Sequence, residues 1–299
     1  RALDELVGAT FSPRDGLINP NAVRRFYREE AEARGVRFLN RHYIEGVRTA
    51  RVVGEGHPAG ARRVAAVDVF ALELRDPTDE AGVIRDLLTT HAVPRDQRGE
   101  ALRLECELVV NCLGAWSPVF SAKIGVRDVT EPVRRQISLV DVQVDDEGLA
   151  AVLPEAGMVV DASDLYFHPE GGHILAGYST PSEAPGFDFG YDGRAFFEEE
   201  LWPRLAHRAS AFERCDHVRG WSGLYAVTPD CSGIAGAVAG YTNLVEAHSF
   251  TGRGVMQSYG VALAMAEQID TGRSAVDLAP LGRERFSDRA RWIPEDLHI

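Results

Sequence analysis

The sequence places a glycine turn between a short strand and a helix near its C-terminal end. Residues 243–247 are predicted as the strand, Gly252-Arg253-Gly254 as the turn, and a helix is predicted to begin near Val255. Free backbone N–H groups and the dipole of a helix N-terminus attract negative charge. This turn is therefore a predicted site for an anionic group.

A second turn of the same kind follows the predicted strand at 102–110. The sequence NCLGAWSP at 111–118 reads as a strand end, a glycine turn and a helix that starts at Ser117-Pro118. Ligands of open α/β sheets bind at the carboxyl ends of the strands, so a cofactor would contact this turn. The spacing alone also fits an ordinary loop between a strand and a helix.

Other familiar site patterns are missing from the sequence. The nearest match to the dinucleotide-binding G-x-G-x-x-G pattern runs from Gly54 to Gly60, but Pro58 lies inside it and no helix follows, so it is predicted as a hairpin turn. His168 and His173 flank another predicted hairpin without a third ligand nearby, which argues against a metal site. No G-x-S-x-G elbow supports a hydrolase, and no C-x-x-C pair occurs among the four cysteines.

The composition bounds the class of protein. With 299 residues, 45% of them hydrophobic and 26% charged, the chain is predicted to be globular with one large core or two ordinary ones. The net charge of −13 argues against a nucleic-acid partner. We expect no integral membrane segment, because no run of about eighteen apolar residues occurs, and the first residues lack a signal-peptide pattern. A cytoplasmic location is the expectation.

Strand and helix signals predict a mixed α/β chain. Asn19-Pro20 is predicted to cap a helix that ends at Gly35, with a strand starting at Val36-Arg37-Phe38. Further strands are predicted at 64–74 and 102–110, separated by a polar surface insertion with a short helix at 82–90. From 132 to 178 the pattern is that of an antiparallel sheet with a hairpin turn at 169–172, and a helix at 194–207 is expected to pack on it.

Taken in order, several motifs resemble the D-amino-acid oxidase/sarcosine oxidase family of FAD-dependent oxidoreductases, and within it the FAD-dependent oxidoreductase domain-containing proteins. They are DGLINP at 15–20, VVNCLGAWS at 109–117, PVRRQ at 132–136, YFHPEGGHILAGY at 166–178, WSGLYAVTPD at 221–230 and FTGRGVMQSYG at 250–260. The resemblance implies a GR2-type FAD-binding domain (1–124 and 222–299) interrupted by an antiparallel-sheet substrate domain (125–221). The first βαβ unit of that FAD-binding domain is expected to be missing, by truncation or because another chain supplies it.

The resemblance also implies the site residues. Those expected to bind the flavin are Leu113, Gly114, Trp116, Gly252, Arg253, Gly254, Val255 and Met256. Those expected in the substrate pocket are Tyr225, His168 and Arg135, with Arg134 an alternative carboxylate anchor. Strand arginines are also commonly solvated or ion-paired, and His168 could merely pack on Tyr166 or Tyr178.

Four departures from the sarcosine oxidases refine this expectation. The cysteine that binds their flavin covalently corresponds to Gly223, so the FAD is expected to be non-covalent. Their oxygen-activating lysine corresponds to Leu175, their carboxylate-binding lysine to Met256 and a pocket histidine to Ser179. Without the lysine cation, a dehydrogenase is favoured over an oxidase.

The expected function is oxidation of a small amine, amino acid or 2-hydroxy acid, with electrons passing to an acceptor protein or a quinone. Two alternatives remain open. One is a non-catalytic assembly factor that keeps the flavoprotein fold, and the other is a subunit that needs a partner chain to complete the FAD site.

Overall fold

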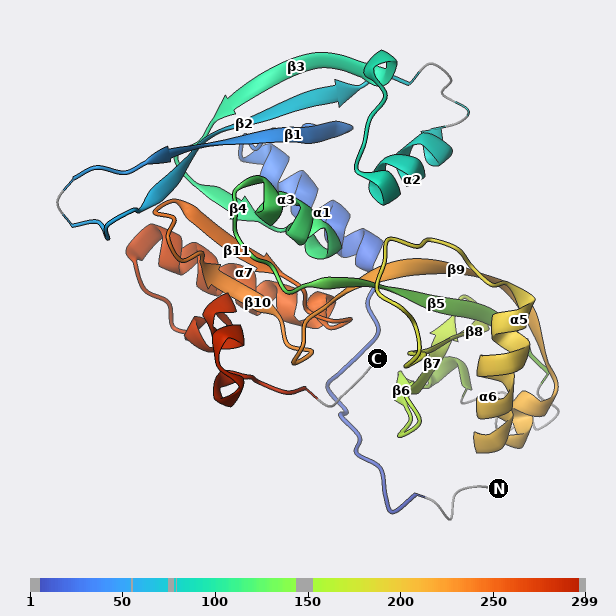
Figure 1. Ribbon diagram of the computed structural model, residues 1–299. Coiled ribbons are helices and arrows are strands. Elements are labelled where there is room, and N and C mark those ends of the chain that lie inside the picture. The colour runs from blue at the N-terminus through green and yellow to red at the C-terminus, as the bar shows by residue number, and fades with distance from the viewer. Residues whose placement is uncertain (1–5, 55, 75–77, 79, 144–152, 296–299) are drawn as a thin grey trace.

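The computed structural model describes residues 6–54, 56–74, 78, 80–143 and 153–295. Residues 1–5, from which the absence of a signal peptide was inferred, and residues 296–299 at the end of the chain lie outside the described part. Within it, three β-sheets and several helices form a mixed α/β fold, as predicted (Figure 1).

The largest sheet has five antiparallel strands in the order β6-β7-β8-β5-β9. Its strands are β5 (Glu131–Val142), β6 (Val159–Val160), β7 (Leu165–Glu170), β8 (His173–Tyr178) and β9 (Cys215–Val227). The predicted hairpin turn between β7 and β8 is confirmed: Gly171 and Gly172 have φ angles of 56° and 87°, which glycine adopts without steric cost.

One helical segment covers one face of this sheet, as the sequence predicted for residues 194–207. It consists of α5 (Arg194–Phe196), a π-helical turn η6 (Phe197–Leu201) and α6 (Trp202–Arg208). Pro203, which has no backbone N–H, interrupts the regular ladder at the start of α6. The core between this segment and the sheet contains Val140, Leu165, Ile174, Ala176, Tyr178, Phe196, Phe197, Leu201, Leu205 and Phe212.

The other two sheets form the second half of the molecule, to which the long strands β5 and β9 extend (Figure 1). One is antiparallel, with β1 (His42–Arg51), β2 (Arg62–Leu72) and β3 (Arg98–Glu105) in sequence order. The other has the order β10-β11-β4, from β4 (Val109–Asn111), β10 (Ile234–Ala237) and β11 (Leu244–His248). Its β4 and β11 are parallel.

The remaining helices are α1 (Pro20–Ala33), α2 (Glu80–Thr90), α3 (Ser117–Lys123) and α7 (Gly254–Thr271). The predicted cap of α1 is confirmed, because the Asn19 side chain accepts a hydrogen bond from the Ala22 N–H at 3.0 Å. Short 3₁₀ turns lie at Arg95–Gln97, Gly114–Trp116, Leu153–Glu155, Ser210–Glu213, Ala279–Leu281, Arg283–Ser287 and Arg289–Arg291.

Two strand predictions were wrong. The single strand predicted at 102–110 is divided between two sheets, because the Asn243 side chain donates to the carbonyls of Cys106 and Glu107 where the chain crosses from β3 to β4. Val36–Phe38 forms no strand, and β1 begins only at His42. Val36 and Phe38 are exposed, and no described strand pairs with them.

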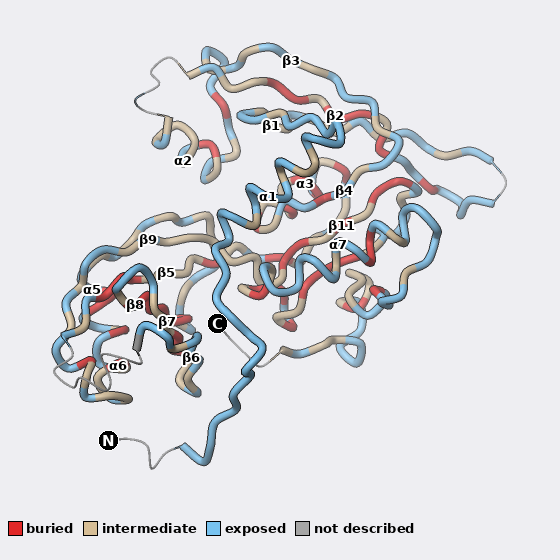
Figure 2. Tube along the Cα trace, turned by 180° about the vertical axis from the view of Figure 1, so that it is seen from behind, coloured by how far each residue is buried: buried red, intermediate tan, exposed pale blue. Residues whose placement is uncertain are grey.

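An apolar surface remains uncovered on α1 and α7. No residue of α1 is buried, and Figure 2 shows both helices exposed along much of their length. A groove of about 480 Å³ runs between the two helices, lined by Val23, Tyr27, Val255, Tyr259 and Leu263 among others. The opposite side of α7 packs on the sheet through Ala264 and Met265. None of the described helices is both long and apolar enough to cross a membrane.

Candidate active site

The strand register collects the three predicted pocket residues on one face of the five-stranded sheet, away from α5 and α6. Tyr225 of β9 lies opposite Val133 of β5, two residues before Arg135, and His168 of β7 lies opposite Leu175 of β8. Side chains two residues apart on a strand point to the same face. Tyr166, which the sequence suggested only as a packing partner, also points to this face.

Tyr166 and Tyr225 form a pair at the centre of this face, with Tyr166 buried and Tyr225 half-buried. Their side chains are hydrogen-bonded to one another. Burial raises the pKa of both phenols, so both are neutral near pH 7. Gly177 lies directly opposite Tyr166 on β8, and a Cβ at this position would overlap the Tyr166 ring. The close approach of this ring to the strand therefore requires glycine.

Arg135 brings a half-buried positive charge to the tyrosine pair. Its guanidinium carbon lies 5.6 Å from the centre of the Tyr225 ring, and its Nη1 donates to the Arg134 carbonyl at 3.0 Å. Its buried Nε has no hydrogen-bond partner within the described structure. Burial lowers the pKa of Arg135, which reflects the cost of keeping this charge away from water. A buried donor of this kind calls for a ligand.

Arg134 points the other way and is already paired. Its Nε lies 2.8 Å from Glu183 Oε1, and its Nη1 lies 3.0 Å from Asp192 Oδ1. These partners hold the Arg134 guanidinium in a structural role. The sequence left both arginines open as carboxylate anchors. Because Arg134 is already paired, Arg135 is the remaining candidate.

His168 lies on the same face but farther along the sheet. His168 lies opposite Leu175 of β8, which in turn lies opposite Leu139 of β5. Leu139 is four residues from Arg135, a separation of about 13 Å along the strand. Its Nδ1 is 2.8 Å from the Pro169 carbonyl oxygen. His168 therefore lies beyond Tyr166 as seen from Arg135.

The predicted anion-binding turn packs directly against Tyr225. A Cβ at Gly252 would lie 2.6 Å from Tyr225 Cε2, so only glycine allows this contact. The turn also contains Ser249 and Thr251 in left-handed conformations, with φ angles of 63° and 44°. Such conformations are costly for residues other than glycine and persist only where the surroundings hold them.

Arg253, at the end of this turn, is buried, with 5% of its surface exposed. Its Nη2 donates to the Cys231 carbonyl oxygen, and its charge, like that of Arg135, favours ionisation of Tyr225 against the larger effect of burial. Val255 and Met256 follow in α7 and are both exposed, and Val255 lines the groove beside α1. The structure thus places Gly252 and Arg253 at the tyrosine pair and Val255 at the groove, with Met256 on the exposed surface of α7.

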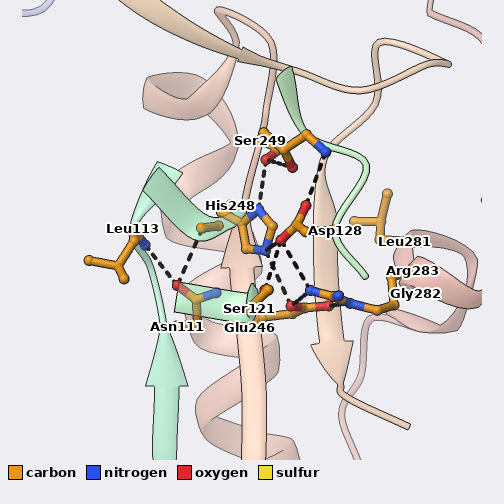
Figure 3. Close-up of polar contacts among 12 residues, drawn as sticks. Asn111, Leu113, Ser121, Asp128, Glu246, His248, Ser249, Leu281, Gly282 and Arg283 are labelled. Atoms are coloured by element: carbon orange, nitrogen blue, oxygen red, sulfur yellow. Dashed lines mark hydrogen bonds and ion pairs between the residues drawn. The ribbon is translucent and has the colours of Figure 1, made fainter. Parts of the chain in front are cut away.

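The second predicted turn ends the strand beside β11. Asn111 pairs with Glu246, so β4 and β11 bring their carboxyl ends, and both turns, to the same edge of the sheet. The Asn111 carboxamide oxygen accepts hydrogen bonds from the Leu113 N–H at 3.1 Å and from the Ser117 hydroxyl at 3.3 Å (Figure 3). These bonds fix the start of the turn that leads through Gly114.

Trp116 is held by contacts within the protein. Its indole N–H donates to the Leu88 carbonyl at 2.9 Å, and its ring stacks on Phe189 with the ring centres 6.2 Å apart. It thus joins α2 and the 187–189 loop to the β4 turn.

One cluster of described residues has donor atoms close enough together for a metal ion: Asp128, Glu246 and His248. The guanidinium of Arg283 already contacts both carboxylates, at 3.4 Å for Asp128 and more closely for Glu246. Arg283 supplies the positive charge that a metal would bring, so the cluster is an ion-pair network. The sequence analysis did not identify it, because its members come from distant segments.

Comparisons with known proteins identify the family of the chain. A family profile described as "DAO: FAD dependent oxidoreductase" matches residues 1–268. The chain is 33% identical to the FAD-dependent oxidoreductase domain-containing protein 1 of Bos taurus over 213 residues, 65% of this chain and 42% of that protein. It is 21% identical to the mitochondrial sarcosine dehydrogenase of Mus musculus over 319 residues, 99% of this chain and 29% of that protein. The chain thus spans less than half the length of these relatives.

Among solved structures, the L-proline dehydrogenase of P. horikoshii is similar in fold, with a TM-score of 0.67 at 19% identity, covering 92% of this chain and 62% of that one. A glycine oxidase from Geobacillus kaustophilus has a TM-score of 0.58 at 20% identity, covering 84% and 54%. Because the family profile covers most of the residues, the chain belongs to the DAO family of FAD-dependent oxidoreductases.

Proposed function

We propose that the protein oxidises a small amine, amino acid or 2-hydroxy acid and passes a hydride to a non-covalently bound FAD. The observation that carries this proposal is the half-buried guanidinium of Arg135 beside the Tyr166–Tyr225 pair, whose buried Nε lacks a hydrogen-bond partner among the described residues. A substrate carboxylate would satisfy this donor and neutralise the half-buried charge.

In this arrangement Arg135 binds the carboxylate and Tyr225 orients the rest of the substrate. Tyr225 is hydrogen-bonded to Tyr166, and in the proposed arrangement Tyr166 donates this bond, which leaves the O–H of Tyr225 to donate to the substrate. Because burial raises the pKa of Tyr225, this hydroxyl keeps its proton at neutral pH. Hydrogen-bonding and positioning are therefore its proposed roles.

The residues around the tyrosine pair fit a flavin ring. Bound FAD supplies the hydride acceptor, and its pyrimidine end gains negative charge on reduction. Arg253 and the backbone of the 249–254 turn lie against Tyr225, where they would stabilise that charge. No atom lies within 4 Å of a Cβ built on Gly223, so the place of the covalent cysteine in the sarcosine oxidases is open space without a thiol.

The ADP half of FAD needs residues that the described chain does not offer. The sequence has no G-x-G-x-x-G turn, and β4 lies at the edge of its sheet. We propose that a βαβ unit outside these 299 residues pairs with β4 and covers the apolar face of α7. The unit belongs either to the same polypeptide or to a partner chain.

A dehydrogenase is the preferred form of the enzyme. Leu175, where the sarcosine oxidases resembled by this chain have a lysine, is buried on the pocket face of the sheet. An aliphatic side chain there would not stabilise superoxide, the first product when O₂ accepts an electron. A protein or quinone acceptor is therefore proposed.

The test is anaerobic reduction of the flavin-loaded protein by a panel of amines, amino acids and 2-hydroxy acids. In Arg135→Met, kcat/KM for a carboxylated substrate should fall about tenfold to a hundredfold, the value of a hydrogen bond to a charged group. The matched control is Arg219→Met, which removes an exposed arginine of β9. A substrate without a carboxylate should not distinguish Arg135→Met from the wild type.

Failure of the whole panel to reduce a bound flavin would favour the assembly-factor alternative. If flavin binds only in the presence of a second chain, the protein is a subunit that shares its FAD site. The uncovered groove between α1 and α7 is the observation that keeps this second alternative open.

A further inference from the structure

The buried network beneath the 249–254 turn joins the turn to three distant segments. His248 is the last residue of β11, and its side chain is fully buried. Its Nδ1 lies 2.6 Å from the Ser249 hydroxyl, and its Nε2 lies 3.2 Å from Glu246 Oε2 (Figure 3). Asp128 lies 3.8 Å from the same Nε2. Both ring nitrogens of His248 are therefore engaged.

Ser249, the first residue of the turn, is held from two sides. Its hydroxyl oxygen lies 2.6 Å from His248 Nδ1 and 2.7 Å from the Thr130 hydroxyl oxygen. The Thr130 N–H donates to Asp128 Oδ1 at 3.0 Å, and the Ser121 hydroxyl donates to Asp128 Oδ2 at 3.1 Å. These bonds connect the turn to the segment at 128–130 and to α3.

The opposite nitrogen of His248 faces an acceptor. Nε2 of His248 meets the Glu246 carboxylate, which only accepts hydrogen bonds while ionised. Burial raises the pKa of Glu246, and the hydrogen bonds and charges of His248 and Arg283 outweigh this effect and lower it. The same balance holds for Asp128, where Thr130, His248 and Arg283 oppose the effect of burial. Both carboxylates are therefore ionised.

Arg283 pairs with both carboxylates of the network. Its guanidinium contacts Glu246 and lies 3.4 Å from Asp128, and its Nη1 donates to the Arg127 carbonyl at 2.7 Å. The side chains of Asp128, Glu246 and His248 are almost completely shielded from water.

We propose that His248 serves as the positioning residue of the flavin-binding turn. It holds the Ser249 hydroxyl, and with it the left-handed backbone at Ser249, while Gly252 at the other end of the turn rests on Tyr225. The contact of the turn with the flavin rests on the proposed function. The contact of His248 with the turn rests on the network alone.

The first experiment measures hydrogen exchange of the backbone amides at 250–254 in the purified protein. His248→Gln, whose side chain cannot contact both Ser249 and Glu246 as the imidazole ring does, should exchange about tenfold faster there than the wild type, corresponding to one lost hydrogen bond to a charged group. The matched control is His217→Gln, which removes a histidine bonded to the Tyr191 hydroxyl at 2.7 Å, outside the network. Equal exchange in His248→Gln and the wild type would overturn the proposal.

A second variant covers the case in which His248→Gln does not fold. Ser249→Gly removes the hydroxyl, and glycine accepts the φ angle of 63° without strain. It should fold and show the same faster exchange at 250–254. Wild-type exchange rates in Ser249→Gly would contradict the relay through Ser249.

The effect of His248 on the flavin has its own measurement. In the flavin-loaded protein, His248→Gln should weaken sulfite binding to the flavin about tenfold, because a displaced turn stabilises the negative flavin adduct less well. Unchanged sulfite affinity would show that His248 does not position the turn for the flavin. If the wild type binds no flavin, the proposed function fails, while the exchange results still decide the role of His248.

Discussion

Gly252 and Tyr225 are in such close contact that a single methyl group at residue 252 would lie 2.6 Å from the Tyr225 ring. This contact joins the turn after β11 to the pocket face of β9. It links the proposed flavin-binding residues to the proposed substrate-binding residues without an intervening side chain.

Gly252→Ala should therefore destabilise the protein by about 1–3 kcal/mol and reduce its flavin content, because alanine is strained at a φ angle of 81° and overlaps Tyr225. Thermal unfolding and the ratio of flavin to protein measure both effects. Gly223→Ala is the control, because no atom lies within 4 Å of its new Cβ. Similar melting temperatures for the two variants would contradict the packing argument.

The 299-residue chain on its own should purify without stoichiometric FAD. The pyrophosphate-binding glycine turn contributes much of the anchoring of a dinucleotide, and this sequence has no such turn. The absorbance spectrum of the purified chain measures the bound flavin. A stable yellow preparation with one flavin per chain would show that the residues present are sufficient.

In the flavin-loaded protein the FAD should be released by acid precipitation. Gly223 stands where the sarcosine oxidases have their attachment cysteine, and it offers no thiol. The fluorescence of the supernatant and of the pellet measures the distribution of the flavin. Fluorescence that stays with the denatured polypeptide would instead reveal a covalent bond to another residue.

Leu175→Lys should speed the reaction of the reduced protein with O₂, because a cation on this face would stabilise superoxide. The unmodified protein should reoxidise slowly in air-saturated buffer and turn over with a quinone or dye acceptor. Stopped-flow absorbance measures reoxidation, and Leu175→Met controls for the change of shape. Rapid reoxidation of the wild type with formation of hydrogen peroxide would make the protein an oxidase.

The buried carboxylates of Asp128 and Glu246 should make the protein sensitive to acid. Their pKa values are lower in the folded protein than in the unfolded chain, so their contribution to the free energy of unfolding is present above the unfolded pKa values, about 4. It is lost as the pH falls through the lower folded values. Urea unfolding between pH 7 and pH 3 measures this loss.

Asp128→Asn should be less stable at pH 7 and show a shallower loss of stability below pH 4 than the wild type. Glu199→Gln changes an exposed carboxylate and serves as the control. The same pH dependence in all three proteins would exclude the buried network as the source of acid sensitivity.

The sequence by itself determined the features that depend on short-range signals. The Asn19-Pro20 cap of α1, the Gly171-Gly172 hairpin turn and the helix at 194–208 follow from side chains or glycine conformations within a few residues. The two glycine turns at 111–118 and 249–254 were also predicted, because each follows a strand and precedes a helix. The resemblance of ordered motifs supplied the family.

Only the tertiary structure decided which of two adjacent arginines on β5 faces the proposed site. Arg134 and Arg135 are adjacent in sequence and are the same type of residue, but they point to opposite faces of β5. Glu183 and Asp192 hold the first, while the second lies beside Tyr225. Which face is covered depends on a helical segment about 60 residues away in sequence, so no local pattern could separate the two arginines.

The network around His248 shows the same limit more strongly. Asp128, Glu246 and Arg283 come from three separate parts of the chain, and each would be an ordinary charged residue in a local pattern. Their charges affect one another only after folding removes them from water, so no local sequence pattern indicates the network. Local signals set the turn and its helix, whereas the contacts that hold the turn in place arise from long-range packing.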